Sequence, residues 1–428
     1  MDGQRGITVK TRDWLEMPQV RKVLKTLNTS ADDSSGAIGD IKARFVGGCV
    51  RDALLGHSVS DIDIATSHSP ERVTALLEAV GAKVIPTGLK HGTVTAVLGH
   101  RHFEITTLRR DVETYGRHAS VAYTDNWQED ARRRDFTLNA LYMDIDETVY
   151  DPSGDGVADL HARRVRFIGE ATDRIREDAL RILRFFRFSA RFCKEGPDAE
   201  GLAACIALSD RLEQLSGERL LQETLKILLA PRAVDMLKVM ADEGVLSHFL
   251  PGPYAFDDLR HLVGLENVLE KVDAERRLAC LLSPLAGISH PLVRHLKLSN
   301  RQQKRLSSMI VDEMGHEVDL GLDRHDAARL LYRAGAESFM DNLLLQWARC
   351  GLPPEDKKGQ ALLMQAADWC APVFPVRGAD LKRLGVEAGP VLGQLKAQLE
   401  DWWINENFQP EKDDLLQQAQ KIMSMMPR

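Results

Sequence analysis

The spacing of apolar residues divides the chain into a mixed first part and a helical remainder. Between about residues 41 and 168, short β-branched runs alternate with polar segments; "VTAVL" (94–98) and "FEITTL" (103–108) flank "GHRH" and predict a β-hairpin. After about residue 170, apolar residues recur at helical spacing, strand signals are scarce, and breakers such as "GLPPED" separate the periodic stretches. The pattern predicts an α+β fold, with a small sheet in a mixed head followed by an all-helical part.

Three polar or amphipathic segments of the first part complete this outline. Residues 7–28 are predicted to form one amphipathic helix, because apolar residues recur there at helical spacing. Residues 31–40, "ADDSSGAIGD", are predicted to be a linker. Residues 109–135 are largely polar and predict a long loop that leads into a helix; long loops of this kind are often functional.

Composition narrows the class of protein. The N-terminus has no apolar leader and no run is long enough to span a bilayer, so we expect a cytoplasmic protein without a membrane partner. Six scattered cysteines without a CxxC pair argue against a disulfide framework or a zinc site. The net charge of −7 argues against bulk nucleic-acid binding, but residues 161–194 hold nine arginines and one lysine against four acidic residues. A local anionic ligand therefore remains possible.

The segment "ARFVGGCVRDALLGHSVSDIDIAT" (43–66) carries the first candidate chemistry. It predicts a strand, a glycine turn, a short helix ended by Gly56, and a second strand. Glycines at such a turn let backbone N–H groups approach an anion. Asp61 and Asp63 project from one face of the second strand, and two carboxylates held together are stabilised by a divalent cation between them. The competing interpretation is a solvated edge strand.

A third acidic residue, Glu104, is predicted to lie on the face of its strand opposite Phe103 and Ile105. It would complete a carboxylate cluster for two Mg²⁺ ions, which activate an attacking hydroxyl and stabilise a leaving oxygen. An ordinary surface glutamate is the alternative.

The segment "GEATDRIREDALRILRFFRFSARF" (169–192) predicts an amphipathic helix with an arginine-rich polar face. On this reading Asp178 and Arg181, at i and i+3, are neighbours on the helix surface. The remaining polar positions of the face are Arg184, Arg187 and Arg191. The arginines outnumber the aspartate, which favours an anionic ligand over an ion pair on a solvated face.

Together with "EDARRRDFTLNALYMD" (129–144), these segments resemble, in order, the bacterial class II tRNA nucleotidyltransferases, a family of CCA-adding enzymes and related poly(A) polymerases. The resemblance covers about residues 41–230. It implies a polymerase β-like nucleotidyltransferase head (1–168), a helical neck with a nucleotide-recognition helix (169–232), an RNA-binding helical body (233–310) and a tRNA-binding helical tail (311–428).

The resemblance also implies roles for individual residues. The catalytic carboxylates would be Asp61, Asp63 and Glu104, with Mg²⁺ held by the first two. The residues expected to bind the nucleotide are Gly48, Arg51, Arg134, Asp135, Asn139, Asp178, Arg181, Arg184 and Arg187. Gly48, Arg51 and Arg134 would contact phosphates, and Asp135 and Asn139 would lie near the ribose.

Asp178 and Arg181 match residues that act as an amino-acid template. The carboxylate would accept a hydrogen bond from the exocyclic amine of C or A, and the guanidinium would donate to the neighbouring ring acceptor. U and G present a carbonyl where the amine should be, so the site leaves its own polar groups unpaired with them and rejects them.

The implied activity is template-independent addition of CCA to the 3′ end of tRNA from CTP and ATP, by in-line attack of the RNA 3′-hydroxyl with two metal ions and release of pyrophosphate. No protein partner is evident. Poly(A) polymerase activity, or partial CC- or A-addition, is the alternative within the family; "DVETYGRHASVAYT" (111–124) resembles the flexible loop of full CCA-adding enzymes and favours CCA addition. His325–Asp326 lacks the remainder of an HDxGK phosphohydrolase signature.

Two other interpretations of the protein stay open at this point, and so does the role of a basic segment. A non-catalytic RNA-binding protein would not need the acidic residues, and a small-molecule nucleotidyltransferase would lack the Asp178–Arg181 segment and the long helical remainder. Basic residues between 291 and 309, including Arg301, Lys304 and Arg305, either contact the tRNA backbone or line an ordinary solvated helix.

Overall fold

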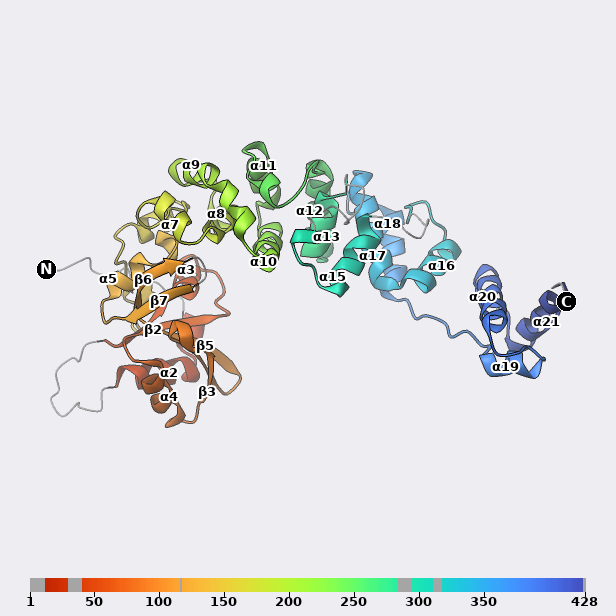
Figure 1. The fold of residues 1–428 in the computed structure, drawn as a ribbon, viewed down its shortest axis with the longest axis horizontal. Coiled ribbons are helices and arrows are strands. Elements are labelled where there is room, and N and C mark those ends of the chain that lie inside the picture. The colour runs from red at the N-terminus through yellow and green to blue at the C-terminus, as the bar shows by residue number, and fades with distance from the viewer. Residues whose placement is uncertain (1–11, 30–40, 116–117, 284–293, 311–317, 426–428) are drawn as a thin grey trace. The chain divides into compact units, whose positions relative to one another are not determined.

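The computed structural model describes residues 12–29, 41–115, 118–283, 294–310 and 318–425, with backbone alone for 12, 111–115, 118–121 and 310. It forms two compact units, Met1–Phe249 and Leu250–Arg428 (Figure 1). The first holds every strand of the described residues, and the second is helical throughout its described part. The predicted α+β order is confirmed, and the finer division into four parts stays a prediction.

A seven-stranded mixed sheet forms the core of the head. Its strand order is β3 (Lys83–Gly88), β4 (Thr93–Leu98), β5 (Arg101–Thr107), β2 (Ile62–Thr66), β1 (Ala43–Val46), β8 (Tyr142–Met143), β9 (Val149–Tyr150). The β4–β5 hairpin is confirmed. Neighbours pair antiparallel except β2 and β5, which run parallel, so the ends of these two central strands reach the same edge of the sheet.

Helices flank the sheet, and the first of them differs from the prediction. The expected single helix over 7–28 is two helices, α1 (Arg12–Leu15) and α2 (Pro18–Asn28). Pro18 starts α2 because its missing N–H is tolerated only in a first turn. The predicted core residues of α2 are buried, while residues 7–11 and the linker 31–40 lie outside the described residues. α3 (Gly48–Leu54) follows β1, and α4 (Pro70–Glu78) follows β2.

The predicted loop over 109–135 is wrong for most of its length. Its residues form a second, two-stranded sheet of β6 (Arg109–Tyr115) and β7 (His118–Tyr123), followed by α5 (Trp127–Arg132). These two strands pair with each other and belong to a sheet separate from the core sheet. Their sequence is rich in polar residues, so the apolar pattern on which strand prediction relies is weak here.

After the sheet, the first unit continues with α6 (Gly156–His161) in the predicted head, then α7 (Ala171–Glu177), α8 (Leu180–Phe192), α9 (Ala199–Ala207) and α10 (Gly217–Leu228) in the predicted neck, and α11 (Ala233–Asp242) beyond it. A cluster of phenylalanines joins the neck to the head. Phe136 of the head lies with its ring centroid 4.9 Å from Phe167 and 5.4 Å from Phe188 of α8, and Phe167 stacks on Phe185 at 5.4 Å. This packing fixes α8 against the head.

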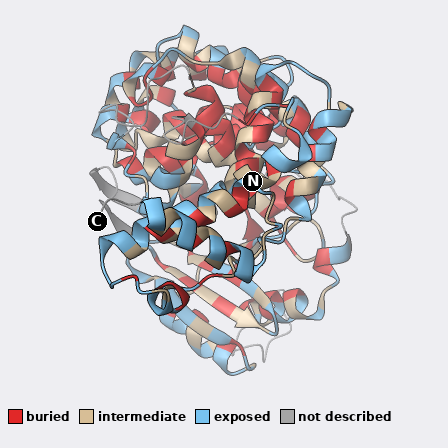
Figure 2. Ribbon diagram, turned by 90° about the vertical axis from the view of Figure 1, so that its right-hand side faces the viewer, coloured by how far each residue is buried: buried red, intermediate tan, exposed pale blue. Residues whose placement is uncertain are grey.

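The second unit consists of α12 (Phe256–Leu269), α13 (Ala274–Leu281), α15 (Asn300–Ile310), α16 (Arg324–Ala334), α17 (Ala336–Arg349), α18 (Lys357–Ala367), α19 (Gly378–Arg383), α20 (Pro390–Asn405) and α21 (Lys412–Met425). Buried residues lie on the inward faces of the helices (Figure 2). The last three helices share a core around Leu399, Trp403 and Leu415. No helix in the described ranges has the length and apolarity to cross a membrane.

Candidate active site

The glycine turn between β1 and α3 places two arginines and an asparagine together. Gly47 has a φ of +72°, and a Cβ there would lie 3.6 Å from Arg134 Nη1 and from the Asn139 carbonyl, so glycine suits the position. Arg51, one turn into α3, is 5% exposed. Its Nη1 donates to Asn139 Oδ1 at 2.6 Å and its Nη2 lies 2.9 Å from Asp52 Oδ1. The predicted strand, turn and helix are confirmed.

Two carboxylates meet at the centre of the sheet. Asp63 of β2 pairs in parallel register with Glu104 of β5, and Ile62 and Ile64 on the opposite face are buried. Asp61 lies exposed just before β2. Burial raises the pKa of Asp63 to about 6, helped by the negative charges of Glu104 and Asp61 and opposed by Arg134 and Arg51. The arrangement gathers negative charge that a cation would stabilise.

The donor set formed by these carboxylates fits Mg²⁺. Carboxylate oxygens are the hard ligands that Mg²⁺ prefers, and the ion is usually held by one or two carboxylates with substrate phosphates and water. Within the described residues, no three His, Cys, Asp or Glu side chains form a metal-binding group by themselves. Asp61 and Asp63 would thus hold the ion together with phosphate oxygens of a nucleotide.

The segment after α5 forms a buried polar network beside the glycine turn. Asp130, 1% exposed, accepts from Arg133 Nε at 2.7 Å, Arg134 Nη2 at 3.1 Å and the Tyr142 hydroxyl at 2.7 Å. Burial alone would raise the pKa of Asp130, but the charges of Arg134 and Arg133 and the Tyr142 hydrogen bond outweigh it and lower the pKa to about 2. The aspartate thereby orients Arg134 toward the turn.

Asp135 and Asn139, predicted to lie near the ribose, form the next layer of this network. Asp135 accepts from Arg184 Nε at 2.6 Å, from Asn139 Nδ2 at 3.2 Å and from the Phe136 backbone N–H at 2.9 Å. Both are 8% exposed. Asp135 holds Arg184 across the boundary between the head and α8, and Asn139 holds Arg51 within the head.

The predicted helical neighbourhood of Asp178 and Arg181 is wrong. The chain leaves the helix at Asp178, which has an extended backbone (φ −151°, ψ 107°) between α7 and α8. Asp178 Oδ2 accepts from Arg219 Nη2 of α10 at 2.7 Å. Arg181 pairs with Glu177 and donates to the Arg174 carbonyl at 2.8 Å. The break presents both side chains to the same cavity from different backbone conformations.

The count of arginines on α8 is also a poor argument for an anionic ligand. Arg184 pairs with Asp135 of the head, Arg187 with Glu223 of α10 at 3.1 Å, and Arg191 with Asp52 of α3 at 3.4 Å. Each arginine has a carboxylate from another element. The sequence hides these partners because they are far away along the chain.

A cavity of about 1070 Å³ brings these groups together between the head and the neck. It is lined by Asp63 and by all nine predicted nucleotide-binding residues, whereas Asp61 and Glu104 lie outside its lining. The lining also includes Arg133, Arg219 and Lys226, which the sequence analysis did not single out. Arg133 lies in the "RRRD" run, so the sequence motif could have identified it. Arg219 and Lys226 belong to α10, whose sequence carries no recognised motif.

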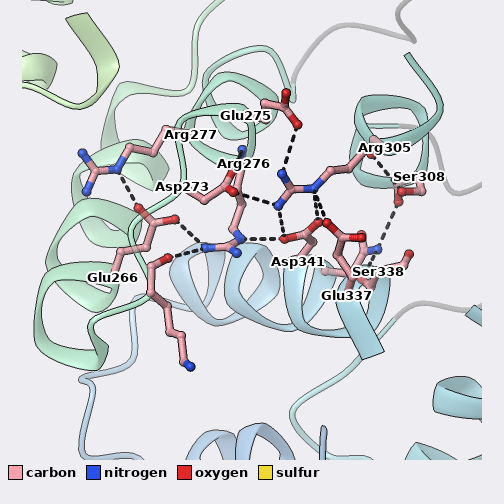
Figure 3. Close-up of polar contacts among 12 residues, drawn as sticks. Glu266, Asp273, Glu275, Arg276, Arg277, Arg305, Ser308, Glu337, Ser338 and Asp341 are labelled. Atoms are coloured by element: carbon pink, nitrogen blue, oxygen red, sulfur yellow. Dashed lines mark hydrogen bonds and ion pairs between the residues drawn. The ribbon is translucent and has the colours of Figure 1, made fainter. Parts of the chain in front are cut away.

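The second unit corrects the expectation for Arg305 (Figure 3). This residue of α15 pairs with Asp273 Oδ2 at 3.0 Å, Glu275 Oε2 at 3.0 Å and Asp341 Oδ2 at 2.9 Å. Asp341 also pairs with Arg276 at 2.9 Å. Arg305 therefore joins α13, α15 and α17 and is not an ordinary solvated residue. Arg301 is 82% exposed and Lys304 is exposed as well. For these two residues, contact with the tRNA backbone and an ordinary solvated helix both remain open. Residues 291–293 lie outside the described part.

Known proteins are similar to this chain in both sequence and fold. The family model "Poly A polymerase head domain" matches residues 43–166, and "Probable RNA and SrmB- binding site of polymerase A" matches residues 197–256. The mitochondrial CCA tRNA nucleotidyltransferase 1 of Danio rerio is 35% identical over 380 residues, which cover 87% of this chain and 86% of the relative.

The chain belongs to the CCA tRNA nucleotidyltransferase family. The CCA-adding enzyme of Geobacillus stearothermophilus is 37% identical over 321 residues, covering 73% of this chain and 75% of the relative. The crystal structure of the Bacillus stearothermophilus CCA-adding enzyme in complex with CTP matches with a TM-score of 0.72 and 29% identity, over 89% of this chain and 93% of that one. The predicted nucleotidyltransferase head, the helical remainder and the enzyme class are confirmed for this member of the family.

Proposed function

We propose that this member of the CCA tRNA nucleotidyltransferase family adds C, C and A to the 3′ end of tRNA, without a nucleic-acid template, from CTP and ATP. The observation that carries the proposal is the cavity between head and neck. It combines the glycine turn and its arginines, the Asp178–Arg181 pair and, at one boundary, Asp63. The groups proposed to bind phosphate, to read the base and to hold the metal would thus adjoin in one place.

The reaction that fits this site is an in-line displacement. The 3′-hydroxyl of the RNA attacks the α-phosphorus of the nucleotide, a phosphodiester bond forms, and the bond to pyrophosphate breaks. Two Mg²⁺ ions held by Asp61 and Asp63, with Glu104 as the third carboxylate, would activate the hydroxyl and stabilise the leaving oxygen. Arg51 and Arg134, with Gly48 at the turn, would hold the triphosphate, and Asp135 and Asn139 would keep these arginines and Arg184 in position beside the ribose.

Base selection is proposed to rest on Asp178 and Arg181. Asp178 Oδ1 accepts from the Leu180 N–H at 3.1 Å and Oδ2 accepts from Arg219. A carboxylate offers about four lone-pair sites, so two remain for the amine of C or A. Arg184 and Arg187 also line the cavity, and Arg187 pairs with Glu223. We propose that these two arginines complete the nucleotide site without reading the base.

Poly(A) polymerase activity is the second candidate, because the matching model for residues 43–166 carries that description. It predicts long A tails on many RNA ends, whereas CCA addition ends after three nucleotides. We further propose a cytoplasmic location, since all six cysteines are free thiols and a reducing compartment preserves them.

The test is incorporation of labelled CTP and ATP by the purified protein into a tRNA that ends before CCA. Poly(A) RNA and an aminoglycoside serve as parallel acceptors. We expect labelling of the tRNA by both nucleotides. Labelling of poly(A) with ATP alone would favour the second candidate, and labelling of the aminoglycoside would overturn both.

A further inference from the structure

Two phenylalanines form an aromatic strip along α8. Phe188 and Phe192 are one helical turn apart, and their rings stack with centroids 6.1 Å apart and planes inclined at 16°. Phe188 is 8% exposed and lines the cavity between the head and the neck, whereas Phe192 is buried and lies outside that lining. The strip thus begins at the wall of the proposed nucleotide site.

The rings of this strip gather guanidinium groups from two elements. The Cζ atom of Arg187 lies 4.5 Å from the ring centroid of Phe188. The Cζ atoms of Arg184 and Arg51 each lie 5.4 Å from the same centroid. Arg51, which belongs to α3 of the head, also lies 4.6 Å from the centroid of Phe192. These distances are within the range of about 6 Å at which a ring face attracts a cation.

The three guanidinium groups around Phe188 crowd positive charge beside the cavity. Burial lowers the pKa of Arg187, and the charges of Arg184 and Arg51 lower it further against the opposing charge of Glu223. Like charges repel one another, whereas the electron-rich face of an aromatic ring attracts each of them. The ring therefore helps to keep the cluster assembled before a nucleotide arrives.

A ring holds an arginine in a different way from a carboxylate. Asp135 accepts a hydrogen bond from Arg184 Nε and so occupies that donor. An aromatic ring attracts the planar face of a guanidinium and takes up none of its N–H donors. The donors at the edge of the guanidinium stay available to phosphate or ribose oxygens. Contact with Phe188 therefore suits arginines that must bind an anionic ligand in a fixed orientation.

We propose that Phe188 is a positioning residue of the nucleotide site, which orients Arg51, Arg184 and Arg187 toward the phosphates and ribose of the incoming nucleotide. The inference rests on the proposed function. The ring is itself fixed, because its centroid lies 5.4 Å from that of Phe136 of the head. None of the three arginines is assigned to the base, so the ring contributes equally to the binding of CTP and of ATP.

The first experiment changes the charge distribution of the ring with little change in its size. Phe188 of the full-length protein is replaced by phenylalanine analogues with one, two or three fluorine atoms, which withdraw electron density from the ring face. The attraction for a cation weakens with each fluorine. We expect the KM values for CTP and ATP to rise in parallel along the series, by about three- to thirtyfold overall. The KM for tRNA should stay within about twofold of the wild type.

Phe186 provides a matched control on the same helix. It is fully buried and its ring contacts that of Phe185. No arginine of the described residues lies over the Phe186 ring. The same fluorine series at Phe186 should leave all three KM values unchanged. An unchanged KM for CTP in the Phe188 series, a rise for only one of the two nucleotides, or an equal rise in the Phe186 series would overturn the assignment.

A binding measurement separates this inference from the proposed function. The affinities of the wild type and of the trifluorinated Phe188 variant for CTP are compared by isothermal titration calorimetry with Mg²⁺ and without tRNA. We expect the Kd to rise by about the same factor as the KM, and equal Kd values would overturn the role of Phe188. Absence of CTP and ATP incorporation into tRNA by the wild type would instead overturn the proposed function, and the calorimetric comparison remains readable in that case.

Discussion

Asp178 is held by Arg219 of α10, with Nη2 and Oδ2 2.7 Å apart, while Arg181 is held by Glu177. The two proposed base-reading side chains are thus fixed by separate partners before any base arrives. Arg219 lies in the first turn of α10 and lines the cavity between the head and the neck, as Asp178 and Arg181 do. Preorganised groups of this kind discriminate well, because a base that cannot pair leaves them unsatisfied.

The first prediction concerns base choice. Asp178→Ala removes the acceptor for the amine of C or A, so discrimination against UTP and GTP should shrink by about ten- to a hundredfold, the worth of a hydrogen bond to a charged group. The measurement is single-nucleotide incorporation with each of the four nucleotides on one tRNA. Arg184→Ala should slow all four alike, because this arginine is paired with Asp135 and is not assigned to the base.

Asp173 provides a matched control for that series. It is exposed on α7 and pairs with Arg176 at 2.9 Å, outside the lining of the cavity between the head and the neck. Asp173→Ala should behave as the wild type. Equal slowing of all four nucleotides by Asp178→Ala, with selectivity retained, would show that Asp178 is structural.

The second prediction concerns the metal ligands. Asp61→Ala and Asp63→Asn should each abolish nucleotide addition and leave the melting temperature close to that of the wild type, because neither side chain belongs to the apolar core. Chelation of Mg²⁺ should likewise abolish nucleotide addition by the wild-type protein. Glu78→Ala, at the exposed end of α4, is the control. Full activity in either aspartate variant would exclude the metal-binding role.

The sequence predicts the position of a site residue better where that position is set by neighbouring residues than where it is set by contacts with distant parts of the chain. The alternation of strand side chains predicts Glu104 on the face opposite Phe103 and Ile105, and the parallel register of β2 and β5 places it beside Asp63. The turn at Gly47 is likewise predicted from the residues next to it in the sequence.

Features set by distant contacts were not readable. Helical periodicity continues through Asp178, and Arg219, the partner of its carboxylate, is 41 residues away along the chain. The arginines of α8 looked unpaired because Asp52, Asp135 and Glu223 reach them only in the fold. The hairpin β6–β7 has a largely polar sequence, and its pairing is therefore not predicted from the pattern of apolar residues.

The third prediction follows from Arg305. Asp341, 1% exposed, would lose one of its two arginines in Arg305→Ala. Leaving a buried charge undercompensated should lower the free energy of unfolding by about 3 kcal/mol, measured by urea unfolding. Arg301→Ala removes an exposed charge from the same helix and should change stability by less than about 0.5 kcal/mol. Equal stabilities of the two variants would contradict the structural role of Arg305.

The fourth prediction concerns acid stability. The folded pKa of Asp130 is about 2, below its ordinary value of 3.8. A lowered folded pKa stabilises the protein above the unfolded pKa, and this contribution, about 2 kcal/mol, is lost as the pH falls from about 4 to about 2. Asp130→Asn should thus unfold at lower urea concentration than the wild type at pH 7, and the difference should narrow below pH 4. A difference that stays constant down to pH 2.5 would contradict the assignment.

The most direct test of the proposed function is the sequence of the RNA 3′ ends that the purified protein makes. A tRNA that ends before CCA is incubated with Mg²⁺ and all four nucleoside triphosphates, and the products are sequenced over a time course. The account predicts C, then C, then a single A, with no U or G and no further growth. Tails of many A residues from the first position, or unordered incorporation of all four nucleotides, would contradict it.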